Sequence, residues 1–149
     1  MKKTILYLLL PFLLISCMHT AEKPINSLSV PISRYKVWKI LVEIFKTYPL
    51  KTIDEQLGYI ETEVIKSGNI WKPPHQKQKD FSGYSYILKI NLNYTKPISS
   101  VTIRKKANIQ KGFLSKKQEI ASDGLEEASL IYKINRELEV QSILNKLTN

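Results

Sequence analysis

The chain has 149 residues, of which 43% are hydrophobic and 24% charged, a balance typical of a globular domain and not of a disordered chain. Lysine and arginine number 23 against 13 aspartate and glutamate residues, so the formal net charge is +10. The single cysteine excludes a disulfide within the chain and a zinc site with several thiolates, and the two histidines leave little material for a histidine-rich metal centre or a catalytic triad.

The first residues of the chain predict export. Lys2 and Lys3 precede an apolar run over residues 5–15, which is shorter than the roughly 20 residues that a helix needs to cross a bilayer. A positive start followed by a short apolar core is the pattern of a signal peptide. We therefore expect residues 1–16 to be a signal peptide, and an exported protein of this kind does not meet nucleic acid.

The apolar core ends on the motif Leu14-Ile15-Ser16-Cys17, which resembles the lipobox of bacterial lipoproteins. The resemblance implies cleavage between Ser16 and Cys17, a diacylglyceryl group on the Cys17 sulfur and acylation of the new amino group. Several acyl chains hold durably, since each buried CH₂ contributes about 0.8 kcal/mol. Met18 stands where aspartate would retain such a lipoprotein in the inner membrane, so the resemblance implies an outer-membrane anchor facing the periplasm. The alternative is an ordinary secretory signal with an incidental cysteine.

The next segment predicts a tether and the start of a domain. Residues 17–27 are polar and predict a lipidated tether, and residues 28–149 predict a single domain. Alternating apolar positions over residues 28–33 predict a short edge strand. Apolar residues at helical spacing then predict a helix over residues 34–47, with Ser33 as its N-cap.

The middle of the chain predicts a meander of strands. The predicted strands are residues 50–53, 59–65, 84–94 and 98–109. Gly58 lies at the turn of the first hairpin, and residues 66–83 predict a long loop. Lys105 falls on the inward-facing positions of the last strand, which predicts an end of the sheet or a bulge there.

The chain closes with a loop and a long helix. Residues 112–122 predict the loop, and Asp123 with Glu126 is spaced as in a capping box at the start of a helix over residues 124–146. The apolar residues of this helix form a wide stripe that drifts along its length. The elements together predict an α+β fold, with an antiparallel sheet of about four or five strands and two helices packed on one face.

The order of elements, β-α-β-β-β-β-α, resembles the helix-grip domain of the BamC lipoproteins of the outer-membrane β-barrel assembly machinery. The residues that carry the resemblance are Val37-Trp38-Lys39-Ile40-Leu41, Ile60-Glu61-Thr62-Glu63 with Trp71 shortly after, and Tyr86-Ile87-Leu88-Lys89-Ile90. BamC has two such domains and a long N-terminal arm, whereas this sequence predicts one domain and a short tether. Lipidation, a compact domain and the lack of a chemical centre predict a non-enzymatic scaffold or accessory role in a cell-envelope complex, and the resemblance adds outer-membrane protein assembly as one candidate complex.

Positive charge is concentrated in the middle of the chain. Residues 66–117 hold twelve lysine and arginine residues and one acid, Asp80. Residues 96–117 predict a site for an anionic envelope polymer, through lipopolysaccharide phosphates or peptidoglycan carboxylates, or for phospholipid phosphates or an acidic protein. The candidate residues are Arg104, Lys105, Lys106, Lys111, Lys116 and Lys117. The alternative is a solvated strand face without a ligand.

Trp71 lies beside the rigid step Pro73-Pro74 in the predicted 66–83 loop. An exposed tryptophan at this place could anchor a protein partner, because large aromatic side chains dominate the energy of many interfaces. The alternative is a tryptophan that folds back over the edge of the sheet.

Glu61 and Glu63 occupy alternate positions of one predicted strand and superficially resemble a paired-carboxylate site. The standard fingerprints of nucleotide, metal and nucleophile sites are absent from the sequence. We therefore expect no catalytic residue, no metal and no cofactor. Three functions stay open: a scaffold lipoprotein, a binding module for anionic envelope polymers, and an enzyme on cell-wall material with Glu61 or Glu63 as its acid.

Overall fold

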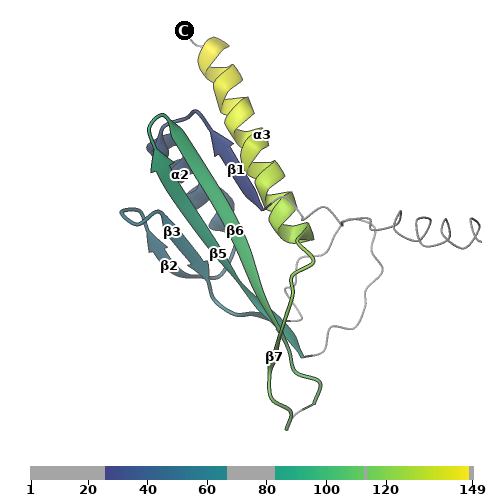
Figure 1. Ribbon diagram of the computed structural model, residues 1–149. Coiled ribbons are helices and arrows are strands. Elements are labelled where there is room, and N and C mark those ends of the chain that lie inside the picture. The colour runs from purple at the N-terminus through teal and green to yellow at the C-terminus, as the bar shows by residue number, and fades with distance from the viewer. Residues whose placement is uncertain (1–25, 67–82, 113, 148–149) are drawn as a thin grey trace, which may run out of the picture.

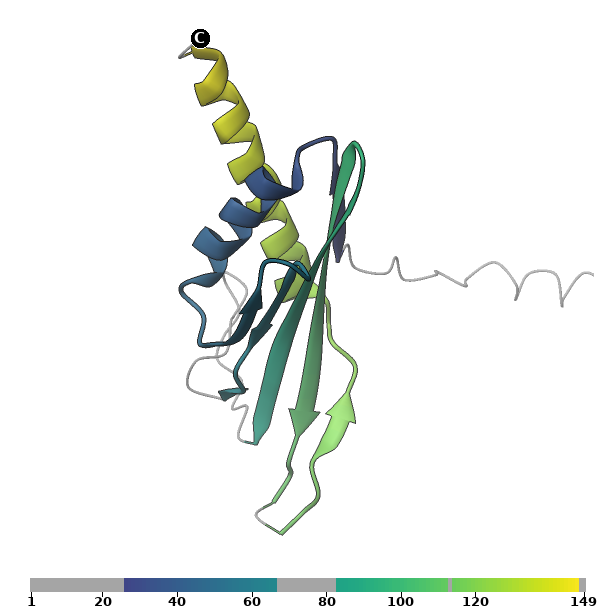
Figure 2. The same cartoon turned by 90° about the vertical axis from the view of Figure 1, so that its left-hand side faces the viewer.

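The structure is a computed structural model, and it describes residues 26–66, 83–112 and 114–147. Its elements in chain order are β1 (Ser27–Val30), α2 (Arg34–Phe45), β2 (Leu50–Asp54), β3 (Tyr59–Thr62), β4 (Ile65–Lys66), β5 (Tyr84–Thr95), β6 (Ile98–Ile109), β7 (Gln118–Ile120) and α3 (Leu125–Leu147) (Figure 1). The strands form one antiparallel sheet, and α2 and α3 lie on one side of it (Figure 2). The predicted α+β class is confirmed.

The sheet is built around one long hairpin. β5 and β6 have twelve residues each and pair without a break from Tyr84 opposite Ile109 to Thr95 opposite Ile98. The strand order is β1-β6-β5-β3-β2, while β4 pairs with β5 and β7 pairs with β6. Strand β7 lies inside the segment predicted as a loop. Its three residues are all exposed, so they carry no alternation of apolar and polar positions by which the sequence could reveal it.

The strand predicted over residues 59–65 is interrupted. Glu61 pairs with Lys89 in β3, whereas Ile65 pairs with Tyr86 in β4, so four steps along one strand match three along its neighbour. Such an extra residue is a β-bulge, and it reverses which side chains face the core. As a result Ile65 is buried although it has the same parity as the outward-facing Glu61. The prediction of one continuous strand was wrong here.

The core lies between the helices and the inward face of the sheet. Alternate residues of the central strands supply the sheet side of the core: Tyr86, Leu88, Ile90, Leu92, Val101, Ile103 and Ala107. The helices supply Val37, Trp38, Ile40, Leu41, Ile44 and Phe45 from α2 and Leu130, Ile131, Ile134 and Leu138 from α3. Removing these side chains from water is the main favourable term in folding, and it fixes which face of each element is buried.

The helix ends agree in part with the capping expectations. Helix α2 ends two residues earlier than predicted, and Ser33 occupies its N-cap position without a side-chain hydrogen bond. At the start of α3, the Leu125 amide donates to Asp123 Oδ1 at 3.3 Å, so Asp123 caps the helix as expected. Glu126, its expected partner in the capping box, is instead fully buried against the sheet.

Gly58 forms the β2–β3 turn, as the sequence predicts. Its φ is +67°, and a side chain on it would collide with the carbonyl oxygen of Leu92. The Leu92 amide donates to the Gly58 carbonyl oxygen at 2.7 Å, which holds the turn against the end of β5. Only glycine combines this backbone conformation with so close an approach.

Candidate functional site

The face of the sheet opposite the helices, termed the open face, carries Arg104 and Lys106 of the predicted anion-binding residues. The register of the strands sets Glu61, Lys89 and Arg104 side by side across β3, β5 and β6 on this face. Lys106 follows two positions along β6, about 7 Å further on. Because Gln118 pairs with Ile109, residues 116–117 come back beside residues 110–111 after the β6–β7 turn.

Five cations therefore follow one line along β6 and out onto the β6–β7 connection. This basic strip consists of Arg104, Lys106, Lys111, Lys116 and Lys117. All five side chains are exposed, and within the part of the chain that the structure describes none of them forms an ion pair. Exposed like charges in a row raise the local positive potential and attract anions.

Lys105 belongs to the predicted anion site but points to the opposite side of the sheet. Its side chain is only 5% exposed and faces the helices. The β5–β6 pairing continues through Lys105 without a shift, so the prediction of a sheet end or a bulge at this position was wrong. Successive side chains of a regular strand alternate between the faces, so the residue between Arg104 and Lys106 must face inward.

The buried Lys105 ammonium group contacts acidic residues at the start of α3. Lys105 Nζ lies 3.0 Å from Asp123 Oδ1, 3.6 Å from Glu126 Oε2 and 3.7 Å from Glu127 Oε2. The Lys105 amide donates to Glu127 Oε1 at 3.3 Å, and the Tyr86 hydroxyl donates to Glu126 Oε1 at 2.9 Å. These five residues, termed the Lys105 cluster, bind the first turn of α3 to β5 and β6.

The charges of the Lys105 cluster compensate one another inside the protein. Burial lowers the pKa of Lys105, but the hydrogen bond to Asp123 and the negative charge of Glu127 outweigh it, and the net shift is upward. Burial raises the pKa of Glu126, against the opposing effects of Tyr86 and Lys105. One ammonium group faces three carboxylates, so this lysine has no charge to offer to an external anion.

Two features of the sequence, taken together, indicate this cluster. A lysine stood on the apolar parity of a strand, and two adjacent acids, Glu126 and Glu127, stood in the first turn of a helix that packs on the same sheet. A charge on a buried position needs a partner of opposite sign. Pairing the two features would have predicted the contact.

Glu61 is held by three donors on the open face. It accepts hydrogen bonds from the Tyr59 hydroxyl and from Lys51 Nζ, the latter at 2.9 Å, and Lys89 Nζ lies 3.3 Å from its other oxygen. The hydrogen bond from Tyr59, followed by that from Lys51, lowers the pKa of Glu61 to about 2. A general acid has to carry its proton near the working pH, so this environment disfavours Glu61 in that role.

Glu63 follows the end of β3 and is exposed. Together with Glu61, Lys51 and Lys66 it lines a hollow of about 590 Å³ at the bulge between β3 and β4. Two of the four charged groups of this hollow, Glu61 and Lys51, are already paired with each other. The two carboxylates therefore share a hollow but do not form the mutually perturbed acid and base that glycoside hydrolysis needs.

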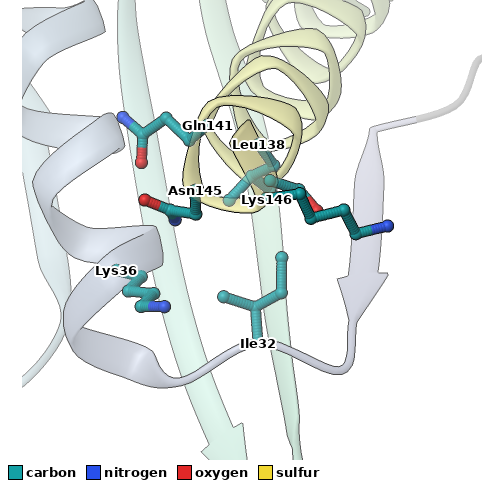
Figure 3. Close-up of a pocket in the computed structure, with 7 residues that line it drawn as sticks. Ile32, Lys36, Leu138, Gln141, Asn145 and Lys146 are labelled. Carbon is teal, nitrogen blue, oxygen red and sulfur yellow. The ribbon is translucent and has the colours of Figure 1, made fainter. Parts of the chain in front are cut away.

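A groove of about 520 Å³ lies between the start of α2 and the second half of α3, and no sequence pattern predicts it (Figure 3). Ile32, which precedes α2, points toward α3 and forms an apolar floor with Leu138. Lys36 and Asn145 add polar groups, whereas the Lys146 ammonium group points away from Lys36. The polar groups of this groove therefore do not converge on one point, as a ligand site requires.

Several predicted site residues lie outside the described residues. These are Ser16 and Cys17 of the lipobox and Trp71, Pro73 and Pro74 of the predicted partner-binding loop. Within the described ranges, no three histidine, cysteine, aspartate or glutamate residues are grouped so as to hold a metal ion. No helix in the same ranges has both the length and the apolar character needed to span a membrane. Neither a model of a known protein family nor a curated protein matches the chain.

Proposed function

We propose that the protein is a lipid-anchored outer-membrane lipoprotein, facing the periplasm, that binds anionic envelope polymers through the basic strip. The lipobox ending on Cys17 supports the location. The observation that carries the ligand class is the basic strip, because its five exposed cations have no acidic partner among the described residues. The buried cation next to them, Lys105, is fully matched by acids, so the lack of partners is confined to the exposed strip.

The shape of the basic strip suits a ligand with several negative groups. From Arg104 to Lys111 the chain advances seven residues, or about 23 Å if it stays extended. Lipopolysaccharide presents phosphates, and peptidoglycan presents carboxylates, at repeated positions over such a length. Each exposed ion pair contributes only about 0.2–1 kcal/mol, so affinity has to come from several contacts at once and has to fall as salt screens them.

Binding of the purified full chain, in detergent, to lipopolysaccharide and to peptidoglycan fragments tests this proposal. The triple variant Arg104→Gln, Lys106→Gln and Lys117→Gln should bind at least about tenfold more weakly, and wild-type binding should weaken as salt rises from about 0.05 M to about 0.5 M. The control variant is Lys36→Gln and Lys39→Gln on α2 with Lys46→Gln at its C-cap, termed the α2 variant, which removes the same charge elsewhere together with the ion pair of Lys46 with Glu43.

The two variants remove the same number of charges, so the proposal requires that binding depend on where the charges lie. Equal weakening by the α2 variant would show a response to net charge alone and would reject the basic strip as the site. Binding to both polymers that ignores salt would reject the proposal altogether.

A scaffold or accessory role in an envelope complex is the second candidate. The α+β fold with two helices on one face of an antiparallel sheet supports it, since this is the architecture that the likeness to BamC implies. Crosslinking in intact cells, followed by identification of the attached proteins, tests this role. A defined set of envelope proteins is expected, and recovery of the chain with no attached envelope protein would contradict a role in a complex.

A further inference from the structure

Helix α3 has two apolar faces. Its inward face, Leu130, Ile131, Ile134 and Leu138, packs in the core. The residues Tyr132, Val140, Ile143 and Leu147 lie on the opposite side, because successive residues are rotated by about 100° around a helix. Their exposed fractions are 68%, 41%, 58% and 78%. The single drifting stripe that the sequence predicts is therefore two separate stripes.

The outward face is unusual for a helix of a monomeric protein. We define the outer stripe as Tyr132, Arg136, Glu139, Val140, Ile143 and Leu147, which recur every three or four residues over about 22 Å. Every residue from 139 to 147 is exposed, and these last turns extend beyond the sheet in both Figure 1 and Figure 2. An exposed helix face is normally polar, so four large apolar side chains on one exposed face mark an interaction surface.

The charges within the outer stripe indicate what covers it. Arg136 and Glu139 lie in the middle of the stripe, and neither forms an ion pair with any residue in the described ranges. Glu139 accepts only a hydrogen bond from Asn135, at 2.8 Å. A helix that lies on an anionic lipid surface is expected to be basic around its apolar face, whereas here one positive and one negative charge stand three residues apart.

We propose that the outer stripe binds the outer stripe of a second copy, with the two α3 helices antiparallel. In a two-fold pair, setting Arg136 opposite Glu139 of the other copy forms that ion pair twice. The same register sets Ile143 opposite Tyr132, so an apolar contact flanks each ion pair. This register forms two ion pairs and two Ile143–Tyr132 contacts together, while Val140 lies opposite Asn135 and Leu147 opposite Ala128. A face with a single sign of charge could not form these ion pairs.

The rest of the molecule is compatible with this pairing. The outer stripe lies on the side of α3 away from the sheet, so a second copy meets neither the core nor α2. Glu137 lines a groove against α2 and lies about 100° around the helix from the middle of the outer stripe, so it stays outside the contact. Arg104 and Lys106 of the basic strip lie on the open face of the sheet, so in a pair these residues of both copies would point away from the shared helices.

A charge-exchange experiment on the purified full chain in detergent tests the proposed pair. Sedimentation over a wide dilution range should show a dimer that dissociates at low concentration. Arg136→Glu and Glu139→Arg should each weaken it by at least about tenfold, because like charges then face each other twice. The double variant with both changes should restore the wild-type dissociation constant, which a purely structural effect would not do.

Two further measurements keep the test decisive. Glu137→Lys reverses a charge on the same helix but about 100° around it from the middle of the outer stripe, and it should leave the dimer unchanged. Because Arg136 and Glu139 are exposed, all variants should keep the wild-type melting curve at a dilution where every protein, the wild type included, is monomeric.

Three results would overturn the proposed pair: a monomer at all concentrations, a dimer that tolerates both single reversals, or a double variant that stays monomeric. A monomer that binds phosphatidylglycerol vesicles, and loses this binding on Ile143→Asp, would assign the outer stripe to a bilayer instead.

Discussion

Position 105 shows how strand geometry can override the preference of a charged residue for water. A regular strand cannot turn one side chain outward without a bulge, and β6 has none. The lysine is therefore buried, and its charge is compensated by Asp123, Glu126 and Glu127. Because the latter two carboxylates are buried as well, the stability of the first turn of α3 depends on this one ammonium group.

Replacing Lys105 by methionine should lower the free energy of unfolding by about 3 kcal/mol at neutral pH, because removing one partner leaves buried carboxylates without their cation. Urea unfolding measures this loss. Lys106→Met, one residue along the strand but on the open face, should change stability by less than about 0.5 kcal/mol.

The loss in the Lys105 variant should also depend on pH. Burial already raises the pKa of Glu126 in the folded protein, so folding favours its protonated form. Stability from such a group is present at low pH and is lost as pH rises through the folded pKa. The variant should therefore recover stability on acidification, and a loss that is constant with pH would show that packing alone is responsible.

For Glu61 we expect the opposite dependence of folding stability on pH. Its pKa is lowered to about 2 by Tyr59 and Lys51, so the folded protein favours the ionised form. The stabilisation is present above the ordinary pKa of 4.5 and is lost as pH falls from there toward about 2. Glu61→Gln should lower the melting temperature at pH 7 and flatten its decrease on acidification.

The control for Glu61 is the neighbouring acid. Glu63→Gln removes an exposed carboxylate that forms no ion pair within the described ranges, so its melting profile should follow the wild type. If both variants gave the same profile between pH 2 and pH 5, the three donors around Glu61 would not account for the acid dependence.

At the scale of elements, periodicity in the sequence predicts the long helices and strands well. The alternation over residues 84–94 and 98–109 identified both strands of the central hairpin and the inward positions that the structure buries. It could not identify β7, whose residues are all exposed, or the bulge before Ile65, since an inserted residue leaves no mark in composition. The acids of the Lys105 cluster were missed because the sequence does not show which segments meet.

The two faces of α3 lead to a prediction about the end of this helix. Residues 139–147, the last that the structure describes, are all exposed, so ending the chain after Gln141 should cost no more than about 1 kcal/mol of folding stability. The same truncation removes Ile143 and Leu147 from the outer stripe and should abolish the proposed dimer. Calorimetry and sedimentation on one sample separate the two effects, and a truncated chain that fails to fold would show that the last turns stabilise the core.

At the scale of the whole molecule, the proposed lipid anchor determines where the domain acts. Cys17→Ser removes the only sulfur in the chain that could carry a diacylglyceryl group. The variant should move from the membrane fraction to the soluble fraction, and the wild type should show the added acyl mass by intact-mass analysis. An unmodified Cys17 in the wild type, or a serine variant that stays in the membrane, would contradict the anchor.

The strand nearest to that anchor is also an edge of the sheet. Among the described strands β1 pairs with β6 alone, through four residue pairs from Ser27 to Val30. Just before β1, the Ile103 amide donates to the Asn26 carbonyl oxygen at 2.9 Å. Any mechanical load between a lipidated Cys17 and a bound polymer would pass through this short ladder. β1 would then be the first part of the domain to peel away, while the long β5–β6 hairpin stayed intact.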